Sequence, residues 1–144
     1  MKAATLLATS AFAIAASMAA VGIGAAVDTP RTLMSPADYA VLKKAVEAET
    51  RLALAACRPL PGAQRDVCKA QARADERIKR ADLQARYHGT VAAAEDAREA
   101  RVKAHYDVAR ARCAGQSGEE RMECLRAARE ERNRSIEALR MAAT

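Results

Sequence analysis

The chain has very few aromatic residues. Its 144 residues include no Trp, three Tyr and one Phe, and that single residue, Phe12, lies in an uncharged N-terminal run. Aromatic side chains bury large areas, so their scarcity excludes a thick hydrophobic core. Alanine dominates the remaining apolar residues, and it has the highest helix propensity but buries little surface. The composition therefore predicts closely approaching helices with modest packing energy, which need an added covalent constraint.

Motifs for catalysis and for cofactor or metal binding are also absent. The sequence has no glycine-rich phosphate loop, no CxxC or CxxCH motif, and no histidine close to a cysteine. We assign His88 to a helix end and His105 to an inward-facing position. Most carboxylates have a basic residue one helical turn away, which is typical of a solvated surface. The pairs on the second predicted helix are Asp75–Lys79, Glu76–Arg80 and Asp82–Arg86. We therefore expect a non-enzymatic protein with no catalytic residue, cofactor or metal site.

The four cysteines form two identical pairs. Cys57 and Cys68 are separated by ten residues, as are Cys113 and Cys124, and the pairs are offset by 56 positions. This register indicates a duplicated unit. The same offset aligns further identical residues, namely Ala53/Ala109, Ala55/Ala111, Gly62/Gly118, Arg65/Arg121, Ala72/Ala128, Arg73/Arg129 and Leu83/Leu139.

Each repeat is predicted to be a helix, a short loop and a returning helix. In the first repeat, residues 35–88, Ser35 caps a helix that the prolines of 58–62 must end, and a second helix runs from about Ala63 to His88. No segment alternates with period two, so strands are not expected.

In the second repeat, residues 89–144, Thr90 caps a helix to about Arg112 and the segment 114–118 breaks it. Ser117 and Glu120 form a capping box for the last helix.

An apolar stripe on each helix is expected to face inward. Its members are Tyr39, Leu42, Val46, Ala53 and Cys57; Val67, Ala70, Ala74, Ile78, Ala81 and Ala85; Val91, Ala94, Val102, His105 and Ala109; and Met122, Leu125, Ile136 and Leu139.

Gly89 decides how the two hairpins are arranged. If it ends a helix, the hairpins fold against each other as a four-helix bundle; if the helix continues, residues 64–112 form one elongated rod. Thr90 favours the break, because it can cap the next helix. The predicted fold is all-α, with two tandem disulfide-stapled helical hairpins.

A hairpin brings the end of one helix beside the start of the next. This favours the local disulfides Cys57–Cys68 and Cys113–Cys124, although four cysteines allow three connectivities. Closing a loop of this length contributes about 3 kcal/mol on the chain-entropy account.

The N-terminus has the features of a secretory signal. Residues 3–27 carry no charge and end in small residues before Asp28. We predict a signal peptide over 1–26 and a flexible leader over 27–34. The alternative is an uncleaved anchor, since the uncharged run is long enough to span a bilayer, and it would be the only membrane contact. Both interpretations place the rest of the chain in the periplasm or outside the cell.

Positive charge is concentrated in the first repeat. Residues 27–88 carry 12 basic and 8 acidic groups, whereas residues 89–144 carry 11 and 10. An electrostatic partner should therefore prefer the first repeat. For an exported protein, this points to anionic components of the cell envelope rather than to nucleic acid.

A resemblance to a known family is found in residues 65–72, 81–87 and 89–90. Here the chain resembles Ala- and Lys-rich exported helical proteins of Gram-negative bacteria, which carry this cysteine loop twice and are sometimes labelled TolA-like. The resemblance covers about residues 36–140. It departs at 121–124, where Arg-Met-Glu-Cys replaces an expected Asp-Val-Cys triplet. It implies an exported helical protein and brings no activity.

Together these observations favour a structural or protein-binding role in the cell envelope. The expected partner is an envelope protein or an anionic surface. One alternative is a periplasmic holdase chaperone, although the LTxxQ motif of the Spy-like group is missing. Another is a metal-handling or redox protein, which would require free thiols.

Overall fold

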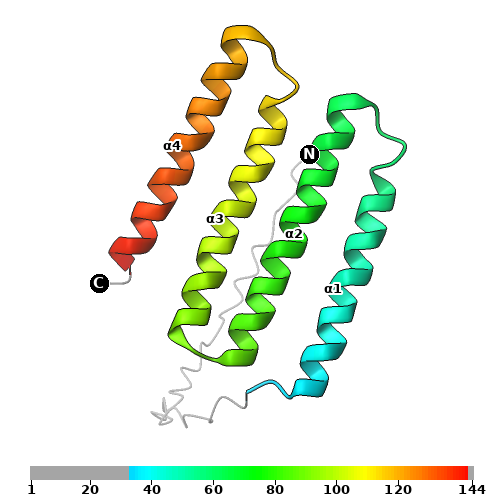
Figure 1. The fold of residues 1–144 in the computed structure, drawn as a ribbon, viewed down its shortest axis with the longest axis vertical. Helices are drawn as coiled ribbons and strands as arrows, with labels where there is room; N and C mark the ends of the chain where they lie inside the picture. The colour runs from blue at the N-terminus through cyan, green and yellow to red at the C-terminus, as the bar shows by residue number, and fades with distance from the viewer. Residues whose placement is uncertain (1–32, 143–144) are drawn as a thin grey trace, which may run out of the picture. The chain divides into compact units, whose positions relative to one another are not determined.

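The structure is a computed structural model that describes residues 33–142, and it is all-helical over that range, as predicted (Figure 1). The four helices are α1 (Pro36–Ala56), α2 (Gly62–His88), α3 (Val91–Cys113) and α4 (Gly118–Ala142). None of these helices combines the length and hydropathy that crossing a membrane requires. The predicted signal peptide and residues 27–32 of the predicted leader lie outside the described residues.

The chain reverses direction at Gly89, as the sequence predicted. Gly89 is the C-cap of α2, with φ 64°, and its N–H donates to the Ala85 carbonyl at 2.9 Å. Thr90 then caps α3, because its side-chain oxygen accepts from the N–H of Ala93 at 3.2 Å. Two hairpins result instead of one long rod.

The helices lie side by side in the order of the sequence (Figure 1). Among the described residues, α1 contacts only α2, α4 contacts only α3, and α2 and α3 join the hairpins. The core between α2 and α3 consists of Ala74, Ala104 and Val108, with Ile78 packed against it. Alanine allows the two backbones to approach closely, so the thin core predicted from the composition is present. Within residues 33–142, the sides of α1 and α4 that face away from this core have no helical neighbour.

The first hairpin is fastened at both ends. A disulfide joins Cys57 to Cys68 at the loop, with their Cα atoms 5.6 Å apart. At the other end, the rings of Tyr39 and Tyr87 have their centroids 4.5 Å apart. Ser35 caps α1 as predicted, since its hydroxyl oxygen accepts from the N–H of Asp38 at 3.0 Å.

The second hairpin has the same covalent staple. Cys113 and Cys124 are joined, again with a Cα separation of 5.6 Å, and none of the cysteines is free. The loops also share a backbone feature, because Gly62 and Gly118 have φ values of 35° and 54°. A Cβ at either glycine would meet nothing within 4 Å, so backbone conformation rather than space favours glycine there. The duplication therefore extends from the sequence to the loop geometry.

Part of the predicted inward stripe is wrong. Leu42, Ala53, Val91, His105 and Met122 are exposed. In α3, the buried residues Ala104 and Val108 define the face toward α2. Because successive residues are rotated by about 100°, His105 falls outside the face that Ala104 occupies. Alanine on several sides of each helix leaves more than one apolar stripe, and the neighbouring helix selects among them.

Candidate functional site

A row of basic side chains runs along one side of α2. Arg73, Arg77 and Arg80 are spaced by four and three residues, which places them on the same side of a helix, and His88 continues the row at the end of α2. All four line a groove between α2 and α3, together with Glu76 and Gln84. The groove thus has one wall rich in hydrogen-bond donors.

The remainder of the groove is formed by small residues. Its other lining residues are Ala81 of α2 and Ala93, Asp96, Ala97 and Ala100 of α3. Asp96 is the only acidic residue among those that α3 contributes. Alanine side chains cover little of the backbone and leave room beside the arginine stems, which can lie along the apolar surface with their guanidinium groups in water. The α3 side of the groove is therefore mostly alanine, and the arginines are all on the α2 wall.

The three arginines differ in their partners. Arg77 Nη1 pairs across the helices with Asp107 Oδ2 at 2.5 Å, and Arg80 Nη1 pairs with Glu76 Oε1 of its own helix at 3.2 Å. Arg73 makes no ion pair with any residue in 33–142. A planar guanidinium with several donors is suited to phosphate and carboxylate groups. Arg73 offers such donors directly, and Arg80 retains donors beyond the one used by Glu76.

The basic row belongs to the first repeat alone. With the offset of 56 residues, the positions on α4 that correspond to Arg73, Arg77 and Arg80 are Arg129, Asn133 and Ile136. Two of the three charges are therefore missing from the second repeat. This difference agrees with the uneven charge of the two halves. The basic row is therefore specific to the first repeat and was not copied into the second.

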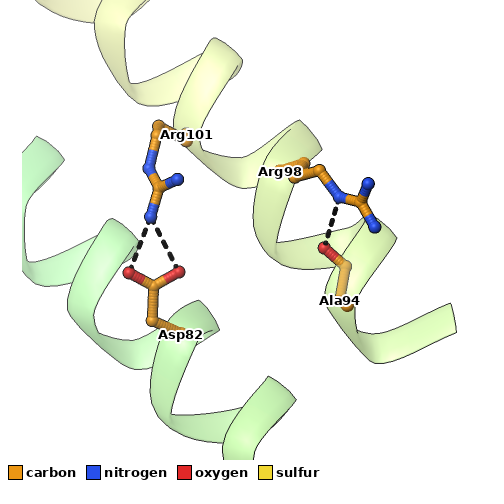
Figure 2. A network of polar contacts seen from close by, with 4 residues as sticks. All are labelled: Asp82, Ala94, Arg98 and Arg101. Atoms are coloured by element: carbon orange, nitrogen blue, oxygen red, sulfur yellow. Dashed lines mark hydrogen bonds and ion pairs between the residues drawn. The ribbon is translucent and has the colours of Figure 1, made fainter. Parts of the chain in front are cut away.

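A second ion pair between α2 and α3 joins the two hairpins. Figure 2 shows that Arg101 of α3 reaches Asp82 of α2, whereas Arg98 turns back to its own helix and donates from Nε to the Ala94 carbonyl at 3.3 Å. Arg101 Nη2 donates to both carboxylate oxygens of Asp82, at 3.0 and 2.8 Å. Asp82 thus binds α3 instead of Arg86, the partner predicted from its spacing.

Another groove lies between α3 and α4 and centres on an aromatic ring. The guanidinium carbon of Arg132 lies 4.7 Å from the centroid of Tyr106, and that of Arg110 lies 5.7 Å from it. Cations at these distances are attracted to the face of the ring. Basic and acidic residues line both grooves, but the basic residues here come from both helices, whereas those of the groove between α2 and α3 all lie on α2. The charged residues that line the groove between α3 and α4 are Glu95, Asp96, Arg98, Glu99, Lys103, Asp107, Arg110, Arg132 and Arg140.

None of the four cysteines has a free thiol. All four are joined in the two local disulfides, at the loop of each hairpin. Across residues 33–142, no group of three or more His, Cys, Asp or Glu side chains is placed to hold a metal ion. His88 lies at the end of α2 as expected and also lines the basic groove, a position that the sequence did not reveal.

Comparison with protein-family models, curated proteins and solved structures identified no match to the chain. The interpretation of the site therefore depends on its own chemistry. The sequence signal for the basic row was the four-and-three spacing of arginines on α2. This spacing can be recognised as a site only after the structure shows that this side of α2 lines a groove.

Proposed function

We propose that this is a non-enzymatic, exported helical protein that binds an anionic surface of the cell envelope through the groove between α2 and α3. The observation that carries the proposal is the row of Arg73, Arg77, Arg80 and His88 along one wall of that groove. Phosphate-bearing lipid headgroups are the ligands proposed for it. Arginine binds such groups through several donors at once.

Electrostatic attraction supports this assignment. A basic side chain close to an anionic membrane surface contributes on the order of 1 kcal/mol, and the effect declines within a Debye length. The row holds its charges along several turns of one rigid helix, so they can meet a surface together. The disulfide at the loop and the contact between Tyr39 and Tyr87 at the other end hold α2 beside α1.

The disulfides also support a destination outside the reducing cytosol. The predicted signal peptide over residues 1–26 and the resemblance to exported Ala- and Lys-rich proteins favour the same destination. We assign the protein to the periplasm or the cell exterior on this basis. The assignment is compatible with a partner surface made of anionic lipid headgroups.

Vesicle binding tests the proposal. The protein, purified after export, would be sedimented with vesicles of phosphatidylglycerol and phosphatidylcholine, and with vesicles of phosphatidylcholine alone. We expect binding to the anionic vesicles at low salt and its loss at high salt, because salt screens exposed charges. Equal binding to both vesicle types, or no binding to either, would count against the proposal.

A further inference from the structure

An apolar stripe runs along the side of α1 that faces away from α2. It consists of Val41, Ala45, Ala48, Leu52 and Ala55, spaced by four, three, four and three residues. Val41 and Leu52 are 66% and 73% exposed. This spacing is the heptad pattern of helices that pair along their length.

The opposite side of α1 is already used. Thr50 lies on the opposite side of α1 from Val41, because nine residues rotate the helix by two and a half turns. Thr50 is buried. The only described helix in contact with α1 is α2. The stripe is therefore a second apolar surface that has no helical neighbour within residues 33–142.

The internal repeat shows what such a stripe does elsewhere in the chain. Adding 56 to its positions gives Ala97, Arg101, Ala104, Val108 and Ala111 of α3. Ala104 and Val108, the equivalents of Ala48 and Leu52, are 0% and 5% exposed and form the core against α2. Thus α1 carries outward nearly the same surface that α3 buries against a helix.

The same repeat argues against pairing of the α1 stripe with α4 of another copy of the chain. The α2 residues Ala74 and Ile78, which contact α3, correspond to Glu130 and Arg134 of α4, and both are exposed charges. Burying them against an apolar stripe would remove their hydration without a partner. A contact between α4 and α1 would also lack the ion pair that joins α2 to α3. The residues that correspond to Arg77 and Asp107 are Asn133 and Arg51, which cannot form an ion pair. A head-to-tail filament is therefore disfavoured.

We propose that the stripe on α1 pairs with α1 of a second copy of this chain, in parallel orientation, to give a symmetric dimer. An isologous contact of this kind is closed and needs only one self-complementary surface. The proposal is independent of the anionic groove, because it uses a different helix.

The charges beside the stripe select the parallel orientation. Lys44 and Arg51 lie along one flank and Glu49 lies along the other. Parallel pairing places the basic flank of one copy against the acidic flank of the other. Lys44 then lies beside Glu49 of the second copy, which is five positions later in the sequence. Antiparallel pairing would place the two basic flanks together. Glu49 already accepts from Lys79 of α2, and both residues are exposed, so the carboxylate has room for a second cation.

The dimer should be weak. Three of the five stripe residues are alanine, and one helix pair lies at the low end of specific interfaces, below about 1,200 Å². We expect a dissociation constant in the micromolar range or above, with the population of dimer rising over the accessible concentration range.

Sedimentation equilibrium of the exported protein over a range of concentrations tests the pairing. Leu52→Gln should raise the dissociation constant by more than about tenfold, because each dimer loses two buried leucines. The matched control is Val91→Gln, since Val91 of α3 is 74% exposed and lies outside the stripe. A monomer at every concentration, or equal effects of the two substitutions, would overturn the proposal.

Charge reversal tests the orientation. Lys44→Glu and Glu49→Lys should each weaken the dimer by placing like charges together, and the double variant K44E/E49K should restore it. Circular dichroism of each variant checks that the helices are intact. Failure of the double variant to recover the dimer would contradict parallel pairing through α1.

Discussion

Asp82 and Arg101 join the two hairpins through one guanidinium nitrogen, which donates to both carboxylate oxygens at 2.8 and 3.0 Å (Figure 2). Arg77 and Asp107 join the same two helices. The buried core residue Ala104 lies in the contact between these helices. The relative contributions of ion pairs and core can be separated by substitution.

The Asp82–Arg101 pair should contribute little stability. The side chains of Asp82 and Arg101 are 43% and 47% exposed. Solvent-exposed ion pairs of this kind contribute about 0.2–1 kcal/mol to the free energy of unfolding. We therefore expect Asp82→Asn to lower the free energy of unfolding by less than about 1 kcal/mol in urea denaturation. Added salt should reduce this difference, because it screens the pair. A loss several times larger would show that the pair, and not the core, holds the hairpins together.

The core alanine should matter more. Ala104 is fully buried where α3 meets α2, so Ala104→Leu would force the helices apart. We expect it to destabilise the fold by about 1–3 kcal/mol, the range for overpacked cores. Ala92→Leu is the control, since Ala92 is an exposed residue of the same helix and its change should stay within about 0.5 kcal/mol. Equal effects at the two positions, measured by thermal and urea unfolding, would refute this account of the core.

The disulfides should supply a large share of the stability. Each closes a loop between cysteines 11 positions apart, which corresponds to about 3 kcal/mol on the chain-entropy account. We expect C57A/C68A and C113A/C124A to lower the free energy of unfolding by similar amounts, because the two staples have equal Cα separations and loop lengths. Unfolding of the intact protein with and without a reductant provides the comparison. Unchanged stability after complete reduction would contradict a stapling role.

Gly89 should resist replacement because of its backbone conformation. Its φ of 64° lies in the left-handed region, and a Cβ there would also collide with the Leu33 side chain. We expect Gly89→Ala to cost about 1–2 kcal/mol, and Gly89→Asn to cost less, since Asn adopts this conformation more readily. Leu33 is exposed and can move aside, so backbone strain should dominate. Denaturation midpoints of the two variants test this order, and a reversed order would contradict it.

Local sequence signals predicted the features that depend on neighbouring residues. Ser35 and Thr90 cap helices, and Gly89 ends one, because each effect acts within a single turn. The disulfides followed from the hairpin and the loop spacing. All of these choices require only the residues on either side.

Features that depend on the relative rotation of helices were predicted less well. His105 and Val91 were expected to face inward but are exposed, because alanine-rich helices have several faces that can pack. Lys79 was expected to pair with Asp75 four residues away, yet it pairs with Glu49 of α1. Such partners lie 30 residues apart, and spacing along one helix carries no information about them. The donor wall of the groove was missed because the arginine spacing on α2 does not show which side of that helix lies beside α3.

Vesicle binding by substituted proteins shows most directly how much the basic groove contributes to membrane affinity. Arg73→Gln with Arg80→Gln removes two charges of the row and leaves the Arg77–Asp107 pair intact. Arg121→Gln with Arg129→Gln removes the same charge from exposed positions on α4. At about 1 kcal/mol per basic residue, the groove variant should bind anionic vesicles about 30-fold more weakly than the unsubstituted protein. We predict that the α4 variant changes affinity by less than about threefold; equal losses for the two variants would show that net charge, and not the groove, determines binding.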